Sequence, residues 1–278
     1  MGLRSFLIIL VLTASSRSQD GLQPTLAKTP LKFKLFKHHS TVAWSCASGD
    51  TDAFYYEAGM AVDADGAFRA YHPNNRLGLD SIEHAGRPGH WWALATNTGN
   101  ASGRPVVQRN SDPAPGYYVS MTSLFDASIR SERNPHRFVD AARIPYVVLP
   151  PVGFKHARLG DFVTVINLRN GRVAGAIVAD QSSSDLDMGE GSIALAKALH
   201  INSNPRTGGI DNGVAYVIYP GSGNGKPRRL AEIALNSQRN FQAWGGFAKL
   251  RACLREKVKS ASTPSIESVP VQIPAQEQ

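Results

Sequence analysis

The fold is decided by residues 161–180, DFVTVINLRNGRVAGAIVAD. Two runs rich in Val, Ile and Ala flank Asn170-Gly171, a residue pair typical of a two-residue type I′ hairpin turn. We therefore predict two antiparallel strands joined by that turn. The second run ends at Asp180, so the predicted hairpin places a carboxylate at the end of a strand.

The rest of the chain between residues 53 and 221 alternates short β-type runs with turns. A short helix is expected at 192–199, with Ser192 as its N-cap, and a helical segment at 227–259 is interrupted at Gly245-Gly246. This pattern predicts one mainly β domain of the α+β class, with a β-barrel core and a few helices. Further strands are expected at 53–63, 67–72, 90–96, 105–108, 116–121, 144–150 and 213–221.

The N-terminus has the pattern of a secretory signal peptide. Arg4 precedes an apolar run from Phe6 to Ala14, which is too short to span a membrane, and small residues follow it. We predict a signal peptide at 1–19, a basic lead-in at 20–45, a catalytic domain at 46–258 and a disordered tail at 259–278. The mature protein is expected to be secreted, monomeric and without a membrane partner.

The net charge of +8 lies in the flanks of the chain. Residues 50–245 contain 19 Lys and Arg against 18 Asp and Glu, a net charge of +1. Because this central part has no basic stripe with interleaved aromatic residues, we expect no nucleic-acid partner. Cys46 and Cys253 are the only two cysteines, and they either form a bridge across the domain or remain buried thiols.

The spacing of candidate ligands and nucleophiles argues against several kinds of chemistry. The eight histidines show neither HExxH nor zinc-type Cys/His spacing, and the acids of the DADG turn (residues 63–66) do not complete a calcium loop. The GSGNG segment at 221–225 lacks the strand–serine–helix pattern of a nucleophile elbow. We therefore predict no metal and no cofactor.

Two carboxylates remain as candidates for the chemistry. Asp180 closes an expected strand, and Glu190 lies just before the expected helix at Ser192. A strand end and a helix start can open on one cleft, and glycosidic hydrolysis uses two carboxylates, one as acid and one as base or nucleophile. Turn and capping residues of the same kind are common, so the spacing alone leaves both interpretations open.

Six blocks around this pair resemble one known family, the family 75 glycoside hydrolases, which are chitosanases best known from filamentous fungi. Their order along the chain is that of the family, from about Ala53 to Gly223. The blocks are AFYYEAGMAVDADGAFRAYHP, GLDSIEHAGRPGHWWALAT, PVVQRNSDPAPGYYVSMTSL, IPYVVLPP, RLGDFVTVINLRNGRVAGAIVAD and GEGSIALAKALHI.

The resemblance implies a secreted endo-acting enzyme that cleaves β-1,4-linked glucosamine polymers with inversion. The family's two essential carboxylates correspond to Asp180 in the VAD block and Glu190 in the GEGS block. A weaker similarity to double-psi β-barrel glycanases favours Glu190 as general acid and Asp180 as general base, and the reverse assignment stays open. The chain departs from the fungal pattern in QSSSDLDM (residues 181–188), which adds two acids.

Chitosan carries an ammonium group on each sugar, so its cleft is expected to contain carboxylates and aromatic rings. Other functions stay open at this point: a related glycanase acting on another cell-wall polysaccharide, and a non-catalytic polysaccharide-binding barrel. The predicted partner is chitosan, and the predicted substrate-binding residues are Asp185, Asp187, Asp161, Glu57, Tyr56 and Trp92.

Overall fold

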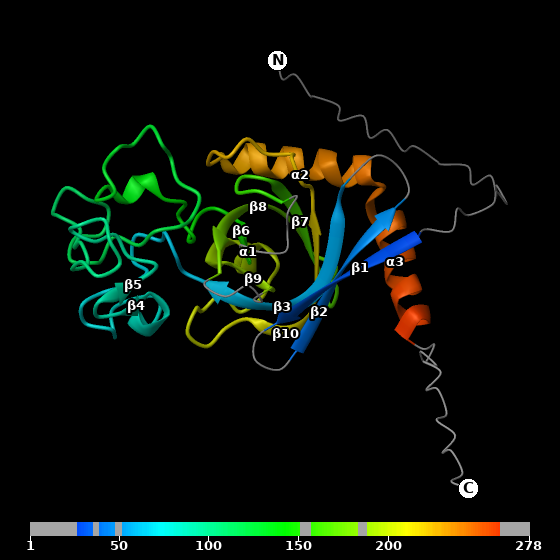
Figure 1. Ribbon diagram of the computed structural model, residues 1–278, viewed down its shortest axis with the longest axis horizontal. Coiled ribbons are helices and arrows are strands. Elements are labelled where there is room, and N and C mark those ends of the chain that lie inside the picture. Colours follow the sequence, from blue (N-terminus) through cyan, green and yellow to red (C-terminus); the bar gives the residue numbers. More distant parts are fainter. Residues whose placement is uncertain (1–26, 36–38, 48–51, 151–156, 183–187, 262–278) are drawn as a thin grey trace, which may run out of the picture.

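The computed structural model describes residues 27–35, 39–47, 52–150, 157–182 and 188–261 (Figure 1). The predicted signal peptide and most of the predicted tail lie outside these ranges, as do Asp185 and Asp187. The strands are β1 (Ala27–Leu35), β2 (His39–Ala47), β3 (Phe54–Asp63), β4 (Gly86–Arg87), β5 (His90–Trp91), β6 (Tyr146–Leu149), β7 (Phe162–Asn167), β8 (Val173–Gln181), β9 (Glu190–Ser192) and β10 (Ile210–Ile218). The helices are α1 (Ile193–Ala198), α2 (Leu230–Trp244) and α3 (Gly246–Ala261), with 3-10 turns at Ile82–His84 and Pro135–Arg137.

Six strands form a closed barrel in the order β3-β10-β7-β8-β6-β9, and β9 closes it by pairing with β3. The β6–β8 and β3–β9 pairs are parallel, whereas the other barrel pairs are antiparallel. Barrel closure leaves no free edge on these strands. The prediction of a mainly β domain with a barrel core and few helices is therefore confirmed.

The hairpin β1–β2 extends the sheet beyond β3, through three paired positions between β2 and β3. These two strands occupy part of the segment predicted as a basic lead-in. Within the barrel the Tyr56 and Tyr216 rings stack, with centroids 4.6 Å apart and planes inclined by 8°. Both rings are fully buried, so their main contribution is apolar area removed from water.

Helix α2 lies across the outside of β7 and β8, and α3 continues from it at a sharp bend (Figure 1). Gly245 at the bend has φ of +113°, a left-handed conformation that ends α2 as predicted. Cys253 on α3 is disulfide-bonded. In the part of the chain that the structure describes, no helix is long and apolar enough to cross a membrane.

Residues 64–145 form a lobe of turns beside the barrel (Figure 1). The strands predicted at 67–72, 105–108 and 116–121 are wrong, and the one at 90–96 shortens to the two residues of β5. Residues 67–72 instead make local turns, such as the bond from Ala70 N to the Ala67 carbonyl (3.0 Å). The other segments lie side by side without forming regular strands: they meet at isolated bridges such as Val107 with Tyr118, beside backbone hydrogen bonds such as the one from the Val119 N–H to the Val106 carbonyl (2.9 Å).

The hairpin β7–β8 exists as predicted, but its two-residue turn is wrong. Asn167 pairs with Arg172 across a four-residue connection, and the Gly171 N–H donates to the Asn167 carbonyl at 2.8 Å. A tertiary contact accounts for the difference: the side chains of Asn167 and Asn170 both donate to the Leu199 carbonyl at 3.1 Å, at the end of α1. The turn is thus shaped by the helix that it caps.

Gly66 fixes the turn that follows β3, and its replacement is expected to be more destabilising than an ordinary glycine substitution. Its φ is +75°, and a Cβ there would overlap the Val139 carbonyl oxygen. We expect Gly66→Ala to lower the free energy of unfolding by at least about 3 kcal/mol, from left-handed strain together with overpacking. Chemical denaturation of the purified variants measures this change.

Gly171→Ala is the matched control, because Gly171 has φ of +74° with nothing within 4 Å of an added Cβ. Left-handed strain alone predicts a loss of about 1 kcal/mol there. Equal losses in the two variants would contradict the proposed contact between the Gly66 turn and the Val139 backbone.

Candidate active site

A cavity of about 320 Å³ opens between the barrel and the lobe. It lies at the ends of β3 and β8 and beside the start of β9, so several strands direct side chains into it. The residues that line it are Ala61, Val62, Asp63, Asp65, Tyr71, Asp80, His84, Trp92, Val148, Asp180, Gln181, Ser182, Glu190, Pro205 and Gly208.

Strand register places Asp180 and Glu190 on either side of one residue. Val148 on β6 pairs with Asp180 on β8 and also with Glu190 on β9. Residues that pair directly across strands present their side chains on the same face of the sheet. The two carboxylates therefore line the same cavity from neighbouring positions, with β6 between them.

Asp180 is buried and held in place through one of its two carboxylate oxygens. Its Oδ1 accepts hydrogen bonds from the Ser123 N–H (3.0 Å), the Ser123 hydroxyl (2.6 Å) and the Gln181 N–H (2.8 Å). The three donors occupy the same oxygen and fix the plane of the carboxylate. The side chain remains 7% exposed.

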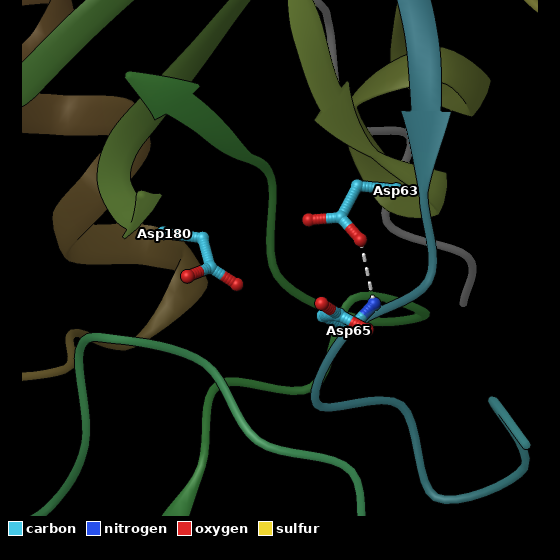
Figure 2. A group of neighbouring side chains, drawn as sticks. All are labelled: Asp63, Asp65 and Asp180. Atoms are coloured by element: carbon cyan, nitrogen blue, oxygen red, sulfur yellow. Dashed lines mark hydrogen bonds between the residues drawn. The ribbon is translucent and has the colours of Figure 1, made fainter. Parts of the chain in front are cut away.

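Two further carboxylates face Asp180 from the end of β3, as Figure 2 shows. Asp63 accepts from the Asp65 N–H (2.8 Å) at one oxygen and from the Tyr146 hydroxyl (2.9 Å) at the other. Asp65 accepts from the Tyr71 hydroxyl at 2.7 Å. Ligand oxygens of Asp63, Asp65 and Asp180 all lie within 4.8 Å of one another, so the three acids form one carboxylate cluster.

Burial is the main cause of the raised pKa values in this cluster. It raises the pKa of Asp180 to about 7, with a further contribution from the charge of Asp63. The pKa of Asp63 rises to about 6, again mainly through burial, against hydrogen bonds that lower it. The pKa of Asp65 rises well above its ordinary value through burial and through the charges of Asp63, Asp180 and Glu190. The cluster therefore retains protons near neutral pH.

No lysine or arginine among the described residues forms an ion pair with the three acids of the cluster. The nearby Asp80 is itself paired with His84, whose Nδ1 lies 2.9 Å from Asp80 Oδ1. Oxygen ligands at this spacing suit a hard cation in principle, although hydrogen bonds from Tyr146, Tyr71 and Ser123 already occupy several of the lone pairs. The same negative field also attracts a cationic substrate.

Residues 117–245 match the family described as "Fungal chitosanase of glycosyl hydrolase group 75". These residues belong to glycosyl hydrolase group 75. For these residues the match bears out the expected family, which is one of glycoside hydrolases. No curated protein matches the chain.

The group 75 segment supplies Asp180, Glu190 and the intervening Val148, together with Ser123, which holds Asp180. The other half of the cavity lies before the matched residues and includes Asp63, Asp65, Asp80 and Trp92. The site is thus completed by the barrel strand β3 and by the first part of the lobe.

The structure brings one of the four described candidates for sugar binding to the cavity. Trp92 lines it with its side chain 47% exposed, and its indole N–H donates to the His84 carbonyl at 2.8 Å, which fixes the ring. Glu57 lies in the middle of β3, opposite Ala215 on β10, and does not line this cavity. Asp185 and Asp187 lie outside the described residues.

Two other candidates are placed in the interior, which corrects their expected role in sugar contact. Tyr56 is fully buried against Tyr216 in the barrel. Asp161 is 1% exposed, and its carboxylate accepts from the N–H groups of Arg158 (2.7 Å), Gly221 (3.1 Å) and Gly223 (2.8 Å). Asp161 therefore holds together the loops that carry these three N–H groups, because its carboxylate accepts the hydrogen bonds that no backbone carbonyl accepts.

The sequence analysis missed Tyr71, Asp80 and His84 as lining residues of the cavity. Tyr71 and Asp80 lie in the turns of the lobe, and His84 ends the 3-10 turn Ile82–His84, so no periodic pattern marks any of them. The spacing of four residues between Asp80 and His84 was the one feature of the sequence that could have indicated a pair. It does not show that the pair lines a cavity, because the sequence does not show where the lobe packs.

The raised pKa of Asp180 predicts a pH-dependent stability. Its folded pKa of about 7 exceeds the unfolded value of about 3.9, so this group favours folding below about pH 4 and loses that contribution as pH rises through 7. Asp180→Asn removes the ionisation while the amide oxygen can still accept the same hydrogen bonds. We expect its unfolding temperature to exceed that of the wild type by at least about 2 °C at pH 8, and by much less at pH 4.

Thermal unfolding at the two pH values measures this difference. Asp211→Asn serves as the control, because Asp211 is exposed and its substitution is expected to leave the pH dependence unchanged. An Asp180→Asn protein that is less stable than the wild type at pH 8 would contradict the placement of Asp180 in a low-dielectric, like-charged cluster.

Proposed function

We propose that this group 75 glycoside hydrolase is an endo-chitosanase that cleaves β-1,4 linkages between glucosamine units with inversion, and that it acts outside the cell. The observation that carries the proposal is the arrangement of Asp180 and Glu190 on either side of Val148 in one cavity. The N-terminal sequence pattern of a secretory signal supports the location.

The strand spacing supports an inverting geometry. Neighbouring strands lie about 4.8 Å apart, so two steps across β6 separate the Asp180 and Glu190 backbones by roughly 10 Å. Inverting glycosidases hold their two carboxyl groups about 6.5 to 9.5 Å apart, which leaves space for the attacking water. Retaining enzymes need about 5 Å, a separation that adjacent strands would provide more readily.

The raised pKa of Asp180 favours this residue as the general acid. A proton donor must remain protonated at the working pH, and burial raises the pKa of Asp180 to about 7. Glu190 is half-buried at the start of β9 and is the remaining candidate for the base that activates water. This assignment reverses the one that similarity to double-psi barrels favours.

The negative charge of the carboxylates that line the cavity supports a cationic sugar as substrate. Five carboxylates line it: Asp63, Asp65, Asp80, Asp180 and Glu190. Asp80 is paired with His84, whose Nδ1 lies 2.9 Å from Asp80 Oδ1. Protonated glucosamine brings positive charge to this site, and the exposed face of Trp92 offers a surface on which a sugar ring can stack.

Substitution of the two carboxylates tests the function and separates their roles. We expect Asp180→Asn and Glu190→Gln each to lower kcat on highly deacetylated chitosan by at least about 1000-fold, because each removes a proton transfer that water replaces poorly. On a chito-oligosaccharide with an activated aryl leaving group, Asp180→Asn should recover most of its activity, since such a leaving group departs without protonation. Glu190→Gln should not recover.

The measurements are reducing-end release, aryl release and the anomeric configuration of the first product by NMR. Asp211→Asn is the control with an unchanged rate. Normal chitosan hydrolysis by either cleft variant, or retention of the anomeric configuration, would contradict the proposal. Binding of chitosan by the wild type without release of reducing ends would instead favour a polysaccharide-binding barrel.

A further inference from the structure

Ser123 is held beside Asp180 by contacts of the residues that flank it in the lobe. The Leu124 N–H donates to the Ala179 carbonyl at 2.8 Å, so the residue after Ser123 is bonded to the residue before Asp180. The Thr122 hydroxyl donates to the Leu124 carbonyl at 2.7 Å and braces the same turn. The place of Ser123 next to Asp180 therefore does not depend on its own hydroxyl group.

Ser123 and Glu190 reach Asp180 from different cavities. Ser123 lines a second cavity, of about 270 Å³, which includes Asp180 but not Glu190. Glu190 lines the first cavity, which includes Asp180 but not Ser123. Asp180 is thus part of the wall between the two cavities, with the serine on one side and the candidate base on the other.

The hydrogen bonds of Asp180 decide which of its oxygens holds a proton. Oδ1 accepts from the N–H and the hydroxyl of Ser123 and from the Gln181 N–H, at 3.0, 2.6 and 2.8 Å. A carboxyl oxygen that carries a proton is itself a donor, so a proton on Oδ1 would face three hydrogens that already point at that oxygen. The retained proton of Asp180 therefore lies on Oδ2.

The hydrogen bonds to Oδ1 gain strength when Asp180 gives up this proton. In the proposed reaction the glycosidic C–O bond breaks, its electron pair stays with the leaving oxygen, and that oxygen takes the proton from Oδ2. Water adds to the sugar carbon and loses a proton to the Glu190 carboxylate. Asp180 then carries a negative charge in a buried site, where an unpartnered charge is costly. Its 2.6 Å bond from the Ser123 hydroxyl has the length of a charge-assisted hydrogen bond.

We propose that Ser123 is a positioning residue for the reaction: its hydroxyl holds Oδ1 of Asp180, directs the proton to Oδ2 and stabilises the carboxylate that proton donation leaves. This inference rests on the proposed function, with Asp180 as the general acid. The Ser123 hydroxyl also lowers the pKa of Asp180, against the burial and the Asp63 charge that raise it. The acid is thus protonated near neutral pH and still able to release its proton.

Ser123→Ala tests the inference, because it removes the hydroxyl and keeps the backbone N–H. We expect kcat on highly deacetylated chitosan to fall at least about fivefold, and the basic limb of its pH profile to rise by about one pH unit. The limb rises because the lost hydrogen bond favoured the ionised acid. Activity on the chito-oligosaccharide with an aryl leaving group should stay within about twofold of the wild type, since that group departs without protonation. Ser123→Thr keeps the hydroxyl and should restore both the rate and the limb.

The other charged groups around Asp180 are the same in all these variants. Those that share a cavity with it are Asp63, Asp65, Asp80, His84, Glu132, Arg137 and Glu190. The amines of chitosan also titrate alike whichever variant is assayed. A difference between two pH profiles therefore reports the loss of the serine hydroxyl.

Ser128→Ala is the matched control. The N–H and the hydroxyl of Ser128 both donate to Asp126 Oδ1, at 2.9 and 2.6 Å, which is the arrangement that Ser123 makes with Asp180. Ser128 is exposed and lies outside both cavities, so we expect an unchanged rate and an unchanged profile. Ser123→Cys is the second variant, for the case that Ser123→Ala fails to fold. Its thiol is a weak donor, so the same changes are expected in the same direction.

The outcomes separate the inference from the proposed function. An unchanged pH profile in a folded Ser123→Ala or Ser123→Cys protein, or an equal loss of rate on both substrates, would overturn the inference and leave the proposed function intact. A shift of the acidic limb in place of the basic limb would show that Asp180 is the base, and it would overturn the inference together with that assignment. A wild-type protein that does not hydrolyse chitosan would overturn the proposed function as well.

Discussion

Repulsion among three buried carboxylates is the constraint on which the site depends. Asp63, Asp65 and Asp180 hold their oxygens within 4.8 Å of one another, and no described lysine or arginine pairs with them. Such a group destabilises the folded chain unless it keeps protons. The barrel supplies the compensation, because β3 and β8 fix two of these acids at strand ends while hydroxyl donors such as Tyr146 and Ser123 satisfy their oxygens. The retained proton is what acid catalysis at a glycosidic oxygen requires.

The same cluster links the barrel to the lobe. Under the proposed function, its carboxylates favour a cationic sugar, and the lobe adds Asp80, His84 and Trp92 to the same cavity. Under the proposed function, the barrel strands supply Asp180 and Glu190, while the turns of residues 64–145 supply much of the rest of the cavity.

The sequence predicted the parts of this arrangement that follow from local pattern. Apolar runs marked β3, β6, β7, β8 and β10, and the residues around Asp180 and Glu190 indicated the family before any geometry was known. The lobe was not predictable, since its segments pair through single bridges rather than through periodic strands. The Asn170-Gly171 turn was mispredicted because two asparagine side chains bond to the Leu199 carbonyl, a contact 29 or more residues away. Tyr56 has the residue type that stacks on sugars, and only the barrel's closure shows that it lies inside.

Direct titration of the Asp180 carboxyl group tests the central claim most directly. With ¹³C-labelled aspartate, the carboxyl resonance of Asp180, assigned by its absence in Asp180→Asn, can be followed from pH 3 to pH 9 in the free protein. The account predicts a midpoint near 7, and a lower midpoint when Asp63 is replaced by asparagine, because the neighbouring charge disappears. A midpoint at or below 4 would show an ordinary ionised aspartate, and it would contradict both the proton-retaining cluster and the role of Asp180 as the acid.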